Sequence, residues 1–237
     1  MSGKMIVIEG CDGAGCETQS KLLKENIEKK CKKPVLYLFY PDYRNSIGKL
    51  IHKFLHEEFD LDVKTQFILY SLDMIKDMQK IKRALKDNRF VVTNRYFLST
   101  MAYQGSQGFS HENALLFADM FEIEKPDLAI LLRIMPETSL KRKKKEKNHL
   151  DRWERDAKFQ RKVAAKYEEL AKNKIFAKKW VVIDGEKPAN DIGEEIFKIV
   201  ASEFGEQLRT RAGQLQTGNN ASFIARQEMS SAPTKRM

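Results

Sequence analysis

The sequence predicts a three-layer α/β fold in which a five-stranded parallel sheet lies between two layers of helices. Five short apolar segments, most of them rich in β-branched residues, have the composition of strands that are buried on both faces. Segments with apolar residues at helical spacing separate them, and this alternation is typical of right-handed βαβ units. The 237 residues, 42% of them hydrophobic, suffice for one large domain of this class or at most two small ones.

The first third of the chain predicts two strands and three helical segments. Residues 5–8 are an apolar run that predicts a strand, and a glycine-rich turn leads from them into a helix over residues 18–30. Residues 35–39 predict the second strand. Residues 47–55 place their apolar side chains on one helical face, and residues 65–85 form the longest amphipathic stretch, which predicts a long helix.

The middle of the chain continues the alternation. A polar break precedes residues 90–93, which predict the third strand. Ser110 is a candidate N-cap for a helix that runs to about Phe121, and residues 128–134 are an almost unbroken apolar run that predicts the fourth strand. Pro136 begins a very basic helix that we expect to continue past Lys147.

The last part of the chain completes the sheet and then changes composition. Residues 180–183 predict the fifth strand and residues 191–204 the last helix. From there Gln, Thr, Asn, Ser and Gly dominate and no periodicity survives. The sequence therefore predicts one domain at residues 1–205, followed by a tail at 206–237 that is disordered or left over from cloning.

Charge and cysteine content narrow the functional class. Lys and Arg number 43 against 33 Asp and Glu, a net charge of +10 that favours anionic partners such as nucleotides, nucleic acid or acidic lipid. The cysteines are Cys11, Cys16 and Cys31, and neither a secreted disulfide framework nor a CxxC zinc site fits this set. No signal peptide or apolar run of membrane length is present, so we expect a soluble, cytoplasmic protein without a membrane partner.

The glycine-rich turn after the first strand has the spacing of a nucleotide phosphate loop. In the pattern GxxxxGK[ST], Gly10 and Gly15 are in register, and a turn of this kind directs backbone N–H groups and a helix dipole at an anion. Cys16 occupies the lysine position and Glu17 the Ser/Thr position, with Thr18 one residue later. A turn that merely connects a strand to a helix remains an alternative. Cys16 is interpreted as either a small space-filling residue or a reactive thiol at a helix N-terminus.

Four segments in order resemble the thymidylate kinase family. Residues 6–19 are similar to its phosphate loop, and residues 39–50 contain an FYPDYR…IGKL stretch similar to its FP-D/N-R…IGxLI pattern. Residues 92–105 contain NRY where the family has DRY, followed by the same AYQG motif. Residues 150–154 (LDRWE) are similar to the LDRxE segment of the family's lid. The resemblance implies a P-loop nucleoside monophosphate kinase fold with a mobile basic lid at about 141–154. It also implies transfer of phosphate from ATP to dTMP with Mg²⁺, giving ADP and dTDP for dTTP synthesis, by a homodimer.

The resemblance also implies roles for individual residues. Asp12, Arg95 and Arg152 would be catalytic. The ATP phosphates would be bound by Gly10, Gly13, Ala14, Gly15, Cys16, Glu17 and Thr18. The acceptor nucleotide would be bound by Asp12, Arg44, Tyr70, Met74, Arg95, Tyr103 and Gln104. Asn94 and Glu17 would lie near the metal ion, and Arg142 with the lysines at 143–147 would supply further lid cations.

Departures from the family pattern keep other functions open. Cys16, Glu17 and Asn94 all change the side of the site that holds ATP and Mg²⁺, which fits a catalytically impaired nucleotide-binding protein of the same fold. Met74 stands where the family has an arginine that contacts the base, so another nucleoside monophosphate is a further alternative. A nucleic-acid-binding module rests on net charge alone, and we expect no nucleic-acid partner.

Overall fold

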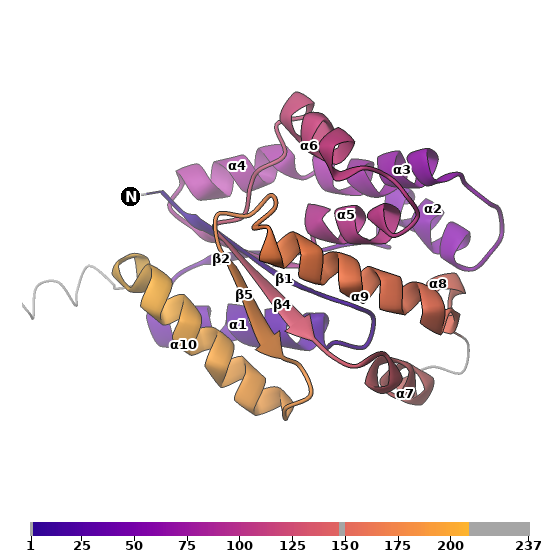
Figure 1. Cartoon of the computed structure of the whole chain (residues 1–237). Coiled ribbons are helices and arrows are strands. Elements are labelled where there is room, and N and C mark those ends of the chain that lie inside the picture. The colour runs from indigo at the N-terminus through magenta and orange to yellow at the C-terminus, as the bar shows by residue number, and fades with distance from the viewer. Residues whose placement is uncertain (1, 147–149, 209–237) are drawn as a thin grey trace, which may run out of the picture.

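The computed structural model describes residues 2–146 and 150–208. Its centre is a five-stranded sheet in which all neighbouring strands run parallel, in the order β2-β3-β1-β4-β5 (Figure 1). The strands are β1 (Lys4–Gly10), β2 (Val35–Phe39), β3 (Phe90–Asn94), β4 (Leu128–Arg133) and β5 (Trp180–Asp184). The predicted five-stranded parallel sheet is confirmed.

Helices cover both faces of the sheet, as predicted. On one face α1 (Cys16–Cys31) packs against α10 (Ala189–Leu208), and on the other lie α5 (Phe97–Gly105) and α9 (Ala157–Lys172) (Figure 1). Alternate side chains of β1 pack against the helices on opposite faces of the sheet. Ile6 and Ile8 belong to the apolar core beneath α1 and α10, whereas Met5 and Val7 belong to the core beneath α5 and α9.

The remaining helices surround the α5 side of the sheet and the carboxyl ends of its strands (Figure 1). They are α2 (Ser46–Leu55), α3 (Val63–Ile75), α4 (Met78–Lys86), α6 (His111–Met120), α7 (Pro136–Glu146) and α8 (Arg152–Arg155). Ser110 is the N-cap of α6, because its hydroxyl accepts a hydrogen bond from the amide of Asn113. None of the helices within the described ranges is both long enough and apolar enough to cross a membrane.

The predicted helix over residues 65–85 is wrong in one respect, since the chain breaks it into α3 and α4. The break falls at Lys76 and Asp77, where the Asp77 carboxylate accepts hydrogen bonds from the Tyr40 hydroxyl (3.2 Å) and the Lys76 ammonium (2.9 Å). These contacts fix the turn through the end of β2. The apolar periodicity continues across the break, so the sequence pattern does not reveal it.

The structure sets further helix boundaries in the C-terminal part of the chain. The described part of the basic helix that begins at Pro136 runs to Glu146, and its predicted continuation past Lys147 lies outside the described residues. After it, the Asp151 side chain begins α8 with a capping box, and the Asp156 side chain begins α9. Residues 206–208 continue α10 rather than belonging to the predicted tail, and residues 209–237 lie outside the described chain.

Candidate active site

A cavity of about 710 Å³ opens at the carboxyl ends of β1 and β3. Its walls come from the loop between β1 and α1, from α3 and α5, from the end of β2, and from the segment that contains α8. This is the edge of a parallel sheet at which ligands bind in open α/β folds, because the loops that follow the strands converge there. The cavity is large enough for a nucleotide-sized ligand.

The loop over residues 10–15 leads directly into the N-terminus of α1. Gly13 and Gly15 have φ values of 76° and 91°, in the left-handed region that favours glycine. A Cβ atom on Gly13 would lie 2.9 Å from the carbonyl oxygen of Ser139, so α7 packs directly on the loop. The Ser139 hydroxyl donates to the carbonyl oxygen of Asp12 (2.6 Å) and Arg142 to that of Gly13 (3.1 Å). No side chain within the described ranges caps α1 at Gly15, so its first amides are suited to bind an anion, as the phosphate-loop interpretation requires.

Cys16 lies at the first position of α1, and the structure favours its interpretation as a small space-filling residue. Its side chain is only 5% exposed although it lines the cavity. Burial raises the pKa of its thiol to about 12, and burial raises the pKa of Cys11 to about 12 as well. Both side chains are therefore neutral thiols at physiological pH rather than reactive thiolates.

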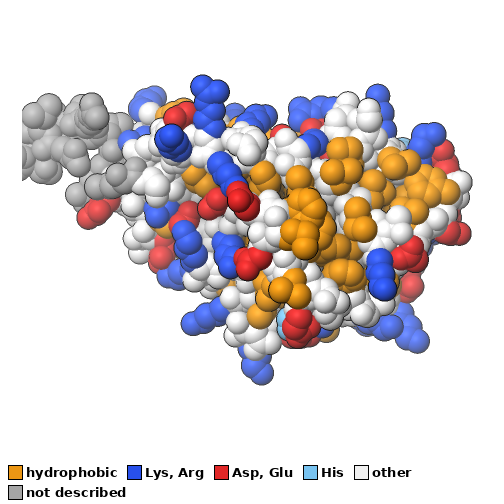
Figure 2. Space-filling model, turned by 90° about the horizontal axis from the view of Figure 1, so that it is seen from above, with side chains coloured by type: hydrophobic (Ala, Val, Ile, Leu, Met, Phe, Trp, Pro, Cys, Tyr) orange, Lys and Arg blue, Asp and Glu red, His pale blue; other side chains and the backbone are white. Residues whose placement is uncertain are grey.

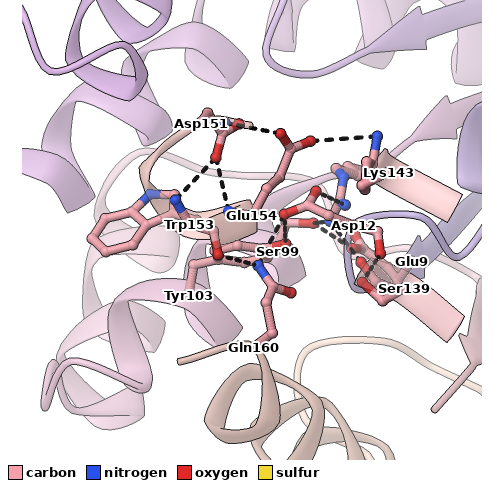
Figure 3. Close-up of polar contacts among 12 residues, drawn as sticks. Glu9, Asp12, Ser99, Tyr103, Ser139, Lys143, Asp151, Trp153, Glu154 and Gln160 are labelled. Carbon is pink, nitrogen blue, oxygen red and sulfur yellow. Dashed lines mark hydrogen bonds and ion pairs between the residues drawn. The ribbon is translucent and has the colours of Figure 1, made fainter. Parts of the chain in front are cut away.

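Arg95 and Asp12 form the charged centre of the cavity. Arg95 has φ of 60°, an uncommon conformation for a residue with a side chain, and its Nη2 lies 2.7 Å from Asp12 Oδ1. Its Nη1 donates to the carbonyl oxygen of Gly10 (2.6 Å), which holds the guanidinium against the phosphate loop. The second oxygen of Asp12 accepts from the Tyr103 hydroxyl (2.8 Å) and from Gln160 Nε2 (3.1 Å) (Figure 3).

Behind Arg95 lies a buried carboxyl group that the sequence interpretation did not single out. Glu9 is the next-to-last residue of β1 and has no exposed surface. Its Oε2 accepts hydrogen bonds from the Ser99 hydroxyl (2.6 Å, Figure 3) and the Tyr167 hydroxyl (3.0 Å). Burial raises its pKa to about 7, although the Ser99 hydrogen bond and the charge of Arg95 oppose the rise. Ser99 and Tyr103 lie one helical turn apart on α5, so both side chains are on the same face of the helix.

The raised pKa of Glu9 predicts a pH-dependent stability. The folded state holds the Glu9 proton more tightly than the unfolded chain, so the contribution is fully present below about pH 4.5 and is lost as the pH rises through about 7. The free energy of unfolding of the wild type, relative to that of Glu9→Gln, is expected to fall by roughly 3 kcal/mol across this window. Urea titrations of both proteins at several pH values measure it. A constant difference between them would show that Glu9 ionises normally.

The residues expected at the acceptor nucleotide lie on the opposite wall. Tyr70 and Met74 of α3 and Tyr103 and Gln104 of α5 all line the cavity. Met74 is almost fully buried, so its thioether offers an apolar surface where a charged side chain was expected. Tyr43 also lines the cavity, which the sequence interpretation did not predict. Thr100 and Trp153 line it as well, and no motif pointed to them individually.

Arg44 and Arg152 are not brought to the cavity by the described structure. Arg44 is exposed and forms two hydrogen bonds to the Asp42 carboxylate, with its guanidinium 4.5 Å from the ring of Phe39. Arg152 lies 4.0 Å above the ring of Phe54 and 2.9 Å from Asp60. Neither arginine is among the residues that line the cavity, and their roles at the nucleotide phosphates stay predictions.

The segment predicted to form the lid lines part of the cavity and also contacts the connection between α2 and α3. Arg152 also donates to the carbonyl oxygen of Phe59, and Arg155 pairs with Glu57, which ties α8 to the connection between α2 and α3. Lys143 of α7 does line the cavity, where it pairs with Glu154 at 3.5 Å (Figure 3). Among the described residues, the cationic side chains that line the cavity are Lys21, Arg95 and Lys143.

The two residues predicted near a metal ion differ in their surroundings. Asn94 lines the cavity, and its Oδ1 is buried without a hydrogen-bond partner among the described residues. Glu17 is exposed and pairs with Lys21 one turn along α1. Within residues 2–146 and 150–208, no group of three or more His, Cys, Asp or Glu side chains is placed to hold a metal. Asn94 thus fits Mg²⁺, which takes few ligands from protein and the rest from phosphate and water.

Comparison with known proteins gives a consistent family assignment. The sequence model described as thymidylate kinase matches residues 8–196. The chain is 36% identical over 193 residues to the probable thymidylate kinase of Methanocaldococcus jannaschii, which covers 81% of this chain and 93% of that protein. It is 28% identical over 214 residues to the thymidylate kinase of Dictyostelium discoideum, covering 90% and 92%. A solved structure of thymidylate kinase from Candida albicans is similar with a TM-score of 0.67 at 25% identity, covering 88% of this chain and 94% of that one.

Proposed function

The chain belongs to the thymidylate kinase family, and we propose that it transfers the γ-phosphoryl group of ATP to dTMP, forming ADP and dTDP for dTTP synthesis. The observation that carries the proposal is the single cavity with a phosphate loop on one wall and the aromatic and amide side chains of α3 and α5 on the other. Arg95 lies between the two walls, beside Asp12. Two nucleotides bound there would meet at their phosphates.

The chemistry requires positioning and positive charge rather than a covalent intermediate. The attacking and leaving oxygens must lie nearly in line, and catalysis comes from holding them there while stabilising the charge of the transferring group. In this proposal the loop amides bind the ATP phosphates. Asp12 holds Arg95 beside the reacting groups, and Tyr70, Tyr103 and Gln104 bind the acceptor nucleoside, with Met74 as an apolar contact to the base.

Mg²⁺ is the metal that we expect to accompany ATP. Its oxygen preference suits the unpartnered Oδ1 of Asn94, which would bind it directly or through water. When bound, the ion neutralises charge on the β- and γ-phosphates.

The cation that the phosphate loop lacks must come from elsewhere in the cavity. Lys143 is the candidate from the lid side, because it lines the cavity from a helix that packs on the loop at Gly13. Lys21 pairs with Glu17 at the exposed rim, and Arg152 contacts Asp60 instead. We assign the missing charge to Arg95 and Lys143 together, with Arg152 able to contribute only if the lid leaves its contacts with the α2–α3 connection.

The proposal is tested by measuring ADP release from Mg²⁺–ATP with dTMP, and with dUMP, dCMP, CMP, UMP and AMP in parallel. Turnover selective for dTMP is the expected result. Selectivity for another monophosphate would reassign the acceptor, a result that the buried, uncharged Met74 would explain. Binding of ATP and dTMP without turnover would identify the second candidate, a catalytically impaired nucleotide-binding protein, which the buried Cys16 thiol favours.

We further propose a homodimer that acts in the cytoplasm. The described cysteines are free thiols, as is usual in reducing compartments. Figure 2 looks onto the face that carries α3 and α6 and shows apolar side chains gathered there. These two helices contact each other through Phe67 and Phe117, whose ring centroids are 5.0 Å apart. Exposed apolar side chains on this face are Ile68, Leu72, Leu116, Met120 and Phe121. A second copy of the chain would cover them.

Met120→Glu is expected to convert the dimer to a monomer, because the substitution places a charge where apolar surface must be buried. Sedimentation velocity of wild type and variant measures the change. Met135→Glu is the matched control, since Met135 is an exposed methionine outside α3 and α6. A wild type that sediments as a monomer at micromolar concentration, or a Met120→Glu variant that remains dimeric, would contradict the proposed interface.

A further inference from the structure

We propose that the carboxylate of Glu9 positions Arg95, acting through the hydroxyl groups of Ser99 and Tyr167. The inference rests on the proposed phosphoryl transfer, in which Arg95 lies beside the reacting phosphates. Glu9 itself does not line the cavity among the described residues, so its role is that of a positioning residue rather than a catalytic one.

Three oxygen atoms form a closed triangle beneath Arg95. Ser99 Oγ lies 2.6 Å and Tyr167 Oη 3.0 Å from Glu9 Oε2, and the two hydroxyl oxygens are 2.7 Å apart. Arg95 Nη1 lies 3.4 Å from Ser99 Oγ and 3.3 Å from Tyr167 Oη, so it rests on the edge of this triangle. β1, α5 and α9 each contribute one member, and each element is anchored in the apolar core beneath the sheet.

Proton counting shows why the charge of Glu9 matters. An ionised carboxylate only accepts hydrogen bonds, so the two hydroxyl protons of Ser99 and Tyr167 are shared among the three oxygen–oxygen contacts. Lone pairs on the hydroxyl oxygens remain for Arg95, which only donates. Its negative charge also attracts the guanidinium across a buried, low-dielectric space. Protonation of Glu9 adds a third proton to the triangle and removes that attraction. The hydrogen bonds of Arg95 to the Gly10 carbonyl and Asp12 do not depend on Glu9 and remain.

Glu9 is the group at this triangle whose ionisation changes near neutral pH. From α1 and the phosphate loop, Cys16 and Cys11 face it as thiols whose pKa values burial raises to about 12. From α9 and α5, Tyr167 and Tyr103 face it as phenols whose pKa values burial raises far above their ordinary range. Asp12 lies on the other side of Arg95 and pairs with it directly. The Leu131 position of β4, which pairs with Glu9 in the sheet, is apolar.

The arrangement therefore couples the position of Arg95 to pH. Glu9 is mostly ionised above about pH 7 and mostly protonated below it. The ionised form of Glu9 positions the arginine and also lowers the folding stability, because a buried carboxylate destabilises the fold. Both effects arise from the same ionisation, and the loss of stability is complete near pH 7, where Glu9 ionises in the folded protein.

The test compares wild type with Glu9→Gln, Ser99→Ala and Tyr167→Phe in two assays between pH 6 and 8.5. The first is the pH profile of kcat with Mg²⁺–ATP and dTMP, with KM values recorded separately. The second is calorimetric binding of dTMP, with thymidine as the probe that lacks the phosphate. Comparing proteins at one pH cancels the titration of the dTMP phosphate. Ser71→Ala and Ser106→Ala are the matched controls, because both serines lie outside the cavity lining and outside the triangle.

We expect wild-type kcat to fall by about tenfold as Glu9 protonates, and Glu9→Gln to show the lower value without that pH dependence. At pH 8 the three variants are expected to bind dTMP about tenfold more weakly than wild type, with thymidine binding unchanged. Glu9→Gln with wild-type affinity for dTMP and a wild-type pH profile would overturn the inference. The calorimetric arm needs no turnover, so wild type that binds dTMP without phosphorylating it would overturn the proposed function and still test the role of Glu9.

Discussion

Replacement of Arg95 by methionine is expected to lower kcat with ATP and dTMP by about 10³-fold or more. Arg95 donates hydrogen bonds to the Gly10 carbonyl and to Asp12, so its guanidinium lies directly against the phosphate loop. Its φ of 60° and its enclosure by three elements fix the guanidinium before substrate binds, so little reorganisation is needed in the transition state. Methionine keeps most of the packing volume and removes the charge.

The measurement is kcat and KM for both substrates, with thermal unfolding to confirm that the variant folds. Arg161→Met is the matched control, because Arg161 is exposed and pairs with Glu137, and neither residue lines the cavity. Arg95→Lys separates charge from geometry, since lysine keeps the charge but cannot bond Gly10 and Asp12 together. A folded Arg95→Met protein with kcat within tenfold of wild type would show that Arg95 has a structural role only.

Replacement of Cys16 by lysine is expected to raise kcat by about 10²-fold. The Cys16 side chain lines the cavity at the first position of α1, where a lysine would extend toward the phosphates of a bound nucleotide. The substitution replaces a neutral thiol with a charge that stabilises the transferring phosphoryl group. Cys16→Ala is the control for loss of the thiol, and we expect it to leave kcat close to that of wild type.

A combination of Cys16→Lys with Lys143→Met tests whether the added positive charge causes the expected gain in kcat. If Lys143 supplies charge that the phosphate loop lacks, Lys143→Met lowers kcat strongly in the wild type and less in the Cys16→Lys background. Lys144→Met is its neighbour on α7 and serves as control, since Lys144 does not line the cavity among the described residues. Two results together would contradict this prediction: a folded Cys16→Lys protein with unchanged kcat, and equal effects of Lys143→Met in both backgrounds. They would show that turnover is not limited by the lack of a cation in the cavity.

The sheet was predictable because its strands are buried on both faces and therefore consist of short apolar runs. Their observed bounds lie within two residues of the predicted ones. Helix α5 was missed for the opposite reason. Its buried residues are spread around the helix, and a helix without a polar stripe lacks the periodicity that marks an amphipathic one.

The site was only partly predictable. The spacing of Gly10 and Gly15 located the phosphate loop, and the resemblance located Arg95, Tyr70 and Tyr103, which the structure brings to one cavity. Glu9 directly follows the predicted strand over residues 5–8, and no sequence motif points to Tyr167. Their contact depends on residues 158 positions apart meeting behind Arg95, which no local pattern encodes.

The position of the Arg152 side chain could not be predicted from its motif. The LDRWE segment is identified by its similarity to the family pattern, and its aspartate begins α8 as a capping residue. The position of the arginine depends on which neighbour the lid contacts. Here it packs on Phe54 and pairs with Asp60, contacts that come from the α2–α3 region and that the motif does not contain.

The central claim is that this chain phosphorylates dTMP although its phosphate loop lacks the usual lysine. The most direct test follows the labelled γ-phosphate of ATP in the presence of Mg²⁺, dTMP and the purified wild-type chain, with products separated by chromatography. We predict that the label appears in dTDP at a rate proportional to enzyme concentration, and that little appears as inorganic phosphate. Label that stays in ATP or passes only to inorganic phosphate, while ATP and dTMP both bind, would contradict the account.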